Sequence, residues 1–181
     1  MILIALAAAA IAGAPPPPIN PGPFPPSSTP QTAARDFYMT YLASPAGGIP
    51  EGRQRARLRP LLSYRLNTLI DEAYRAEVRH ARRTRGREPP VLEGDIFTSL
   101  FEGAGRFEVM RCRSSHARSI CQISLVYNEP RSQPAHWRDQ LVLTRAGSRW
   151  VVDDVIYGGD WQFGNKGRLS LTLRNVIDGQ Y

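Results

Sequence analysis

The side chains best suited to acid-base chemistry are Glu77 and His80, three residues apart in a stretch with helical periodicity. Residues three apart are neighbours on one face of a helix, so a carboxylate and an imidazole would lie side by side there. Burial and mutual contact move the pKa values of such groups toward neutrality, where they exchange protons with a substrate. The alternative is structural, because both residues lie late in the helix, where an apolar stripe ends.

A second carboxylate pair, Asp153 and Asp154, lies in a stretch that alternates like a β-strand. Adjacent residues of a regular strand point to opposite faces, so these carboxylates converge only if the strand is interrupted. The large apolar residues on either side, Trp150 and Val155, fall on opposite phases of the alternation. This slip predicts a β-bulge at the aspartates. The two could then form a catalytic or metal-binding pair, and Asp154 is a third candidate catalytic residue. In the alternative, one aspartate is solvated while the other hydrogen-bonds backbone groups at the bulge.

Motifs for the commonest cofactor and nucleophile chemistries do not occur in the sequence. It has neither a glycine-rich phosphate loop nor a Gly-x-Ser-x-Gly elbow. The other histidines, His116 and His136, lie in predicted connections without partners at a diagnostic spacing. We therefore expect no metal site and no cofactor, and the balance is against an enzyme.

The element that must position Glu77 and His80 is the amphipathic stretch of residues 63–83, which predicts the main helix. Its apolar residues recur with a spacing of three and four. They are Leu62, Leu66, Leu69, Ile70, Ala73, Tyr74 and Ala81. Ser63 precedes the helix as its expected N-cap.

The positive charge of the chain is concentrated around this helix. The formal net charge is +7, and residues 53–87 contain eleven arginines and three acidic residues. Arg75, Arg79 and Arg82 lie on the polar side and form a candidate basic strip for an anionic envelope polymer or an acidic protein. Asp71 precedes Arg75 by four residues, which predicts a weak ion pair. Codon usage in a GC-rich genome is the other explanation of the arginine excess. No reader motif accompanies it, so we expect no nucleic-acid partner.

The remaining pattern predicts an α+β domain. A first helix begins at Thr29 and Pro30 and ends near Leu42, and residues 91–105 form an ordered loop. The expected anchors of that loop are Ile96, Phe97, Leu100 and Phe101. Four strands follow at 106–112, 120–128, 140–144 and 150–157, with short links that imply an antiparallel meander. A short C-terminal helix over 169–177 closes the chain, with Leu169, Leu171, Leu173, Val176 and Ile177 available for packing.

The two cysteines fit a cross-strand pair. If Cys112 faces Cys121, then Met110 faces Ile123 and Glu108 faces Leu125, which places a mostly apolar set on one side of the hairpin. Together with export, this register favours a disulfide. Zinc or redox chemistry is the rival, but no second pair of cysteines accompanies this one.

The first residues have the character of a targeting segment. Residues 1–12 are apolar with small residues at the exit, which predicts a signal peptide. Residues 13–29 are rich in proline and read as a disordered spacer, and residues 30–181 as the single α+β domain. The predicted location is periplasmic or secreted, with no membrane span after cleavage. A proline-rich recognition ligand is the alternative function of the spacer.

Two stretches, residues 94–98 (GDIFT) and 150–155 (WVVDDV), together with the order of helices and strands, carry a family resemblance. The chain resembles secreted bacterial domains of unknown function with the cystatin-like cone of nuclear transport factor two and its relatives. The resemblance implies N-terminal helices packed on a curved four-stranded antiparallel sheet. In enzymes of the wider group an Asp and a His face each other inside the cone. No histidine lies on the strands predicted here, so the dyad is not expected.

These observations lead to one expected function and one alternative. We expect a non-enzymatic binding or interaction module of the cell envelope, whose partner is a small apolar ligand or an envelope protein, an inhibitor or immunity partner being one version. The alternative is a small hydrolase or isomerase that uses Glu77, His80 or Asp154. The sequence does not specify an oligomeric state.

Overall fold

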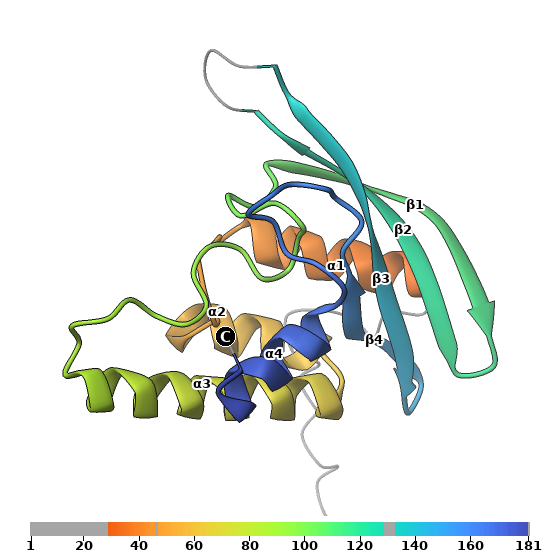
Figure 1. Ribbon diagram of the computed structural model, residues 1–181. Coiled ribbons are helices and arrows are strands. Elements are labelled where there is room, and N and C mark those ends of the chain that lie inside the picture. Colours follow the sequence, from red (N-terminus) through yellow and green to blue (C-terminus); the bar gives the residue numbers. More distant parts are fainter. Residues whose placement is uncertain (1–28, 46, 129–132, 181) are drawn as a thin grey trace, which may run out of the picture.

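The computed structural model describes residues 29–45, 47–128 and 133–180. The predicted signal peptide, 1–12, and the predicted spacer up to residue 28 lie outside the described residues. Within them the chain is α+β, as predicted (Figure 1). Its helices are α1 (Pro30–Leu42), α2 (Gly52–Leu58), α3 (Tyr64–Thr84) and α4 (Leu169–Asp178), with a 3-10 turn at Arg59–Leu61. The strands are β1 (Arg106–Ser115), β2 (Arg118–Tyr127), β3 (Ala135–Ala146) and β4 (Arg149–Ile156), antiparallel in the order β1-β2-β3-β4.

Helix α1 supplies the aromatic centre of the core. Thr29 caps it by accepting the Thr32 N–H at 3.1 Å, and Pro30 occupies the first turn, as the sequence predicted. Phe37 and Tyr38 are fully buried. Their rings lie 5.3 Å from those of Phe97 and Phe107, respectively. Figure 1 shows the strands bending around α1, so the inner side of the sheet is filled by this helix.

Helix α3 begins at its predicted cap, where the Ser63 hydroxyl accepts the Leu66 N–H at 3.0 Å. Its buried stripe differs from the prediction at the C-terminal half. Tyr74 is 40 % exposed and Ala81 is exposed, whereas Ala76 and His80 are buried. The reason is geometric, since a helix of 3.6 residues per turn carries the stripe from Ala73 through Ala76 to His80. Among the described residues, no helix is long and apolar enough to span a membrane.

Helix α2 was not predicted, because its segment is polar and basic and only Leu58 is buried. It places Arg55 against α3. Asp71 pairs with Arg55 at 2.8 Å and with Arg59 at 3.3 Å, so the predicted pairing with Arg75 is wrong. The packing of α2 against α3 thus gives Asp71 a partner sixteen residues away, Arg55, in place of Arg75 on its own helix.

The first hairpin contains the predicted disulfide between Cys112 and Cys121. The rest of the predicted register is wrong, because Val109, not Met110, pairs with Ile123. A bulge between Val109 and Cys112 inserts an extra residue into β1 and shifts the strand by one position. Met110 is consequently 40 % exposed.

The last two strands carry a second irregularity. Val142 pairs with Asp154 and Leu143 with Val152, so Asp153 is the additional residue of the predicted bulge in β4. Strand β3 is longer than predicted and includes His136. This corrects the expectation that no strand carries a histidine. The His136 side chain is nevertheless exposed, while its neighbour Trp137 is buried.

The C-terminal helix matches the prediction except at Leu171, which is 51 % exposed. Leu169, Leu173 and Val176 are buried, and Figure 1 shows α4 lying along α3. The two helices therefore form a layer next to α1 and the sheet, and all these apolar residues belong to one continuous core.

Candidate functional site

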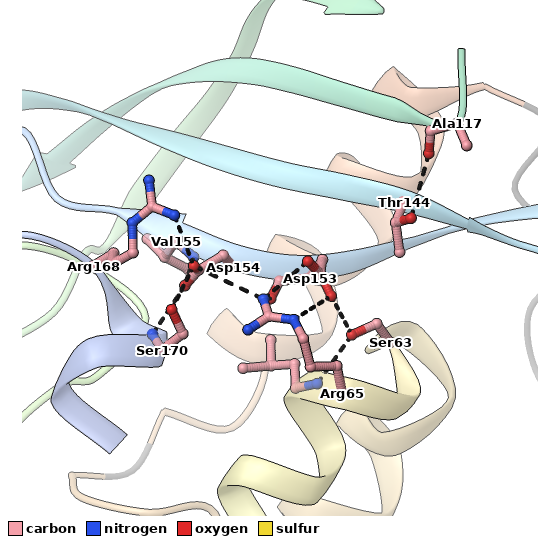
Figure 2. Close-up of polar contacts among 10 residues, drawn as sticks. Ser63, Arg65, Ala117, Thr144, Asp153, Asp154, Val155, Arg168 and Ser170 are labelled. Atoms are coloured by element: carbon pink, nitrogen blue, oxygen red, sulfur yellow. Dashed lines mark hydrogen bonds and ion pairs between the residues drawn. The ribbon is translucent and has the colours of Figure 1, made fainter. Parts of the chain in front are cut away.

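The β4 bulge directs Asp153 to the start of α3 and Asp154 to the start of α4, and Arg65 of α3 also lies 3.9 Å from Asp154 (Figure 2). Asp154 is 2 % exposed and accepts three hydrogen bonds: from its neighbour's backbone, Val155 N (3.0 Å), and from Ser170 N (2.9 Å) and Ser170 Oγ (2.7 Å). Arg168 lies 3.5 Å away. Asp154 thus holds the start of α4, and its oxygens are committed to the fold.

Asp153 is bound to the start of α3. Its Oδ1 accepts the Ser63 hydroxyl at 2.6 Å and Arg65 Nε at 3.1 Å, and its Oδ2 accepts Arg65 Nη2 at 2.9 Å. Burial acts to raise the pKa of Asp153, but the hydrogen bonds from Arg65 and Ser63 outweigh it, so the pKa lies below its ordinary value. The two aspartates do not form a shared acid-base pair.

Glu77 and His80 are drawn to different partners. The two oxygens of Glu77 accept the N–H groups of Val91 (3.0 Å) and Leu92 (2.7 Å), which fixes the chain as it leaves α3. His80 is 8 % exposed, and its Nε2 lies 3.5 Å from a carboxylate oxygen of Glu88. Both side chains line an open pocket of about 280 Å³. The structure therefore brings the predicted pair to one pocket, with Glu77 engaged as a backbone clamp.

The predicted basic strip lies on the exposed face of α3, and its role in binding stays a prediction. Arg75, Arg79 and Arg82 are exposed on α3, as the periodicity indicated. Within the part of the chain that the structure describes, no group of three or more His, Cys, Asp or Glu residues is placed to hold a metal ion.

Asp139 of β3 is a buried carboxylate that the sequence did not identify as a candidate, and it binds two loops next to the sheet. It is completely buried and accepts the N–H groups of Ser99 (2.8 Å) and Gly158 (2.9 Å) and the Trp137 indole N–H (3.0 Å). The Ser99 hydroxyl also donates to it. The same hydroxyl accepts the N–H groups of Gly158 and Gly159, each at 3.0 Å. One carboxylate thereby joins two loops that are far apart in the sequence.

Further hydrogen bonds tie the same two loops together. The side-chain amide of Asn165 donates hydrogen bonds to the carbonyls of Asp95 (2.6 Å) and Thr98 (2.7 Å). The backbone N–H of Asn165 donates to the Ser99 carbonyl (2.8 Å). We call residues 94–103 the first loop and residues 158–166 the second loop. In Figure 1 they lie side by side beneath the β2–β3 hairpin.

Asp95, in the first loop, is a buried carboxyl group with an altered proton affinity. It is 6 % exposed, and its Oδ1 accepts the N–H groups of Phe97 (2.6 Å) and Thr98 (2.7 Å). Burial raises its pKa to about 7, although these hydrogen bonds oppose the shift. A Cβ on Gly103 would lie 2.7 Å from Asp95 Oδ2, so glycine is required for this close approach. Asp95 can gain or lose a proton near neutral pH.

An open, mostly apolar cleft of about 710 Å³ lies between the joined loops and the turn end of the β2–β3 hairpin, where Tyr127 pairs with Ala135. Its lining residues are Leu100, Phe101, Glu102, Tyr127, Ala135, Trp161, Gln162, Phe163 and Gly164. Two rings remain in contact with solvent, since Phe163 is 82 % exposed and Phe101 is 43 % exposed. The Trp161 ring packs edge-on against Trp137 at 5.2 Å. The first loop was predicted to be anchored by Phe101, and this expectation is wrong: Phe101 faces the cleft.

Comparison of the chain with protein-family models finds no match, and comparison with curated proteins finds none either.

Proposed function

We propose that this chain is an exported binding module that takes an apolar group of a small ligand into the cleft between its two loops and the β2–β3 hairpin. The observation that carries the proposal is the exposure of Phe163 and Phe101 at a cleft of about 710 Å³. Ligand sites typically enclose roughly 300 to 1,000 Å³ and have mostly apolar walls with a few polar groups. Glu102 and Gln162 supply the polar groups here.

The way the cleft is built supports a binding role. Its floor is fixed by Asp139, Ser99 and Asn165, whose hydrogen bonds hold both loops before any ligand arrives. A prearranged wall lowers the entropy cost of binding. By contrast, α1 fills the inner side of the sheet with buried aromatic rings. The proposed site therefore lies between the two loops and the turn end of the β2–β3 hairpin, and not on the inner side of the sheet.

Export is the second part of the proposal. The Cys112–Cys121 disulfide supports it, since such bonds persist in oxidising compartments. The apolar first twelve residues supply the targeting argument. A place among the cystatin-like secreted domains is part of the same proposal, and helices against one antiparallel sheet support it.

The test uses N-phenyl-1-naphthylamine, a neutral apolar probe whose fluorescence rises when it leaves water. We expect saturable binding to the disulfide-bonded protein and at least a tenfold weaker affinity in the double variant Phe101→Ala, Phe163→Ala. Met110→Ala is the matched control, because Met110 is an exposed apolar residue on β1. Equal affinity in all three proteins, or no saturable binding, would refute the proposed site.

A small hydrolase or isomerase is the second candidate function. It rests on the shared pocket of about 280 Å³ that Glu77 and His80 line. Such an enzyme loses turnover and keeps its fold when His80 is replaced by Gln. Glu77→Gln is less informative, because its two oxygens hold Val91 and Leu92. Asp154 is the weakest candidate, because its oxygens already accept hydrogen bonds from the N–H and hydroxyl of Ser170 in α4. Hydrolysis of a panel of nitrophenyl esters by the wild type, lost in His80→Gln, would favour this function.

A further inference from the structure

The outer side of the sheet, away from the helices, carries an excess of arginine. Cys112 and its neighbours alternate across β1, so the partly buried Cys112 faces the core while Arg111 and Arg113 are exposed on the other side. Residues two apart on one strand project from the same face, about 7 Å from each other. The two guanidinium groups therefore lie on one strand and one face.

Two amide side chains complete this group. The bulge between Val109 and Cys112 sets Arg111 beside Gln122 of β2, and Gln122 pairs directly with Gln140 of β3. Arg113 pairs with Ile120. These five side chains, Arg111, Arg113, Ile120, Gln122 and Gln140, line one concavity of about 260 Å³. It is the hollow of a sheet surface and belongs to neither the apolar cleft nor the Glu77 pocket.

The arginines of this concavity are not used by the fold. Among residues 29–45, 47–128 and 133–180, the guanidinium groups of Arg111 and Arg113 make no hydrogen bond or ion pair, and Arg113 contributes only its backbone carbonyl, which accepts the Ser119 hydroxyl at 3.3 Å. In contrast, Arg55 and Arg65 of the helices are bound to Asp71 and Asp153. Guanidinium and amide N–H groups are the donors that carboxylate, sulfate and phosphate oxygens accept. Arginine adds a planar fork that binds two oxygens of one oxyanion.

We propose that Arg111, Arg113, Gln122 and Gln140 form a binding site for a small soluble oxyanion, a phosphate or sulfate group, on the outer side of the sheet. The chemistry follows from the four donors and the absence of an acidic residue from the lining of the concavity. Glu108 is the nearest acidic residue on β1, and it lies opposite Ser124, beyond the bulge. Ile120 supplies an apolar edge for the carbon that carries the oxyanion.

The test titrates inorganic phosphate into the full chain with its disulfide intact, followed by calorimetry and by NMR of the glutamine side-chain amides. We expect saturable binding that shifts the Gln122 and Gln140 amide signals. The double variant Arg111→Gln, Arg113→Gln should bind at least tenfold more weakly. The double variant Arg35→Gln, Arg174→Gln removes the same charge from exposed positions on α1 and α4 and should bind within twofold of the wild type.

Three results would overturn the proposal. Equal weakening in both double variants would show attraction by net charge alone. Unchanged Gln122 and Gln140 signals at saturation would place the anion elsewhere. Vesicles of phosphatidylcholine with phosphatidylglycerol form the third arm, because a lipid headgroup offers the same phosphate chemistry. Sedimentation with these vesicles that depends on Arg111 and Arg113, without competition by phosphate, would assign the face to a membrane surface instead.

Discussion

The Ser63 hydroxyl donates a 2.6 Å hydrogen bond to Asp153 Oδ1 and accepts the Leu66 N–H of the first turn of α3. The additional residue of the β4 bulge is thus bonded to the N-cap of the main helix. Ser63 N also donates to the Val152 carbonyl at 2.7 Å. A carboxylate near a helix N-terminus is electrostatically favourable. The bulge therefore fixes where α3 begins on the sheet.

Replacing Asp153 by Ala should lower the free energy of unfolding by about 2 kcal/mol, since the hydrogen bonds from Arg65 and Ser63 to a charged acceptor are lost. Urea unfolding measures the change. Asp160→Ala is the control, because Asp160 is exposed and paired only with Lys166, and we expect no change there. The lowered pKa of Asp153 adds a second criterion. The contribution of the Asp153 carboxylate to the free energy of unfolding is present above about pH 4 and should be lost as the pH falls further.

Asp139→Asn should destabilise the protein by about 3 kcal/mol. Every donor around this carboxylate, Ser99, Trp137 and Gly158, needs an acceptor, and an amide NH₂ offers a donor instead. The variant should also lose the apolar probe, because both walls of the cleft depend on Asp139. Thermal unfolding and the probe titration test the two effects, with the exposed Asp178→Asn as control. A stable variant that still binds the probe would contradict this role.

Periodicity predicted α1, α3, α4 and the sheet, because the residues of each of these elements bury one face. The sequence also predicted the N-caps Thr29 and Ser63 and the β-bulge at Asp153, because caps and bulges have local sequence signatures. The bulge after Val109 was not predicted, because the register was extended from the pairing of Cys112 with Cys121, which lies beyond the bulge. Helix α2 was missed because its contacts, Arg55 with Asp71, span sixteen residues.

The site was less predictable than the fold. Glu77 and His80 were found because helical spacing places them together. Their partners lie outside the helix: Glu77 accepts the Val91 and Leu92 N–H groups, and His80 lies beside Glu88, so helical spacing could not predict them. Asp139 carried one usable signal, a charged residue at an inward position between Trp137 and Leu141. The prediction of β3 began at residue 140, so that signal was not read. No local pattern joins Ser99 to Gly158, and therefore none predicted the cleft.

Removing the disulfide by Cys112→Ala with Cys121→Ala should lower the free energy of unfolding by roughly 2 to 3 kcal/mol, the value for closing a loop of about ten residues. Thermal unfolding should show a lower midpoint. Dithiothreitol should lower the midpoint of the wild type similarly and leave the double variant unchanged. An effect of the reductant on the variant would mean that it acts on something other than this bond.

Asp95 should make the protein less stable as the pH rises from 4 to 7. The unfolded chain loses the Asp95 proton near pH 4, whereas burial keeps it on the folded protein up to a pKa of about 7. The unfolded state therefore binds fewer protons across this interval, and the free energy of unfolding falls, by at most about 4 kcal/mol. Asp95→Asn keeps an oxygen for the Phe97 and Thr98 N–H groups and does not titrate. Its stability should vary less over the same interval.

The difference between the two proteins isolates Asp95, because every other ionisable group is present in both. Urea unfolding at pH 4.5 and pH 7.5 provides the comparison. At pH 4.5 the carboxyl is protonated and resembles the amide, so the two proteins should be nearly equal in stability. At pH 7.5 the variant should be the more stable. The folded wild type must then either bury the charged Asp95 carboxylate or keep it protonated at a pH where the unfolded chain has lost this proton. A variant that is less stable at pH 7.5 would mean that the folded protein stabilises the Asp95 carboxylate, and that the loop needs its charge.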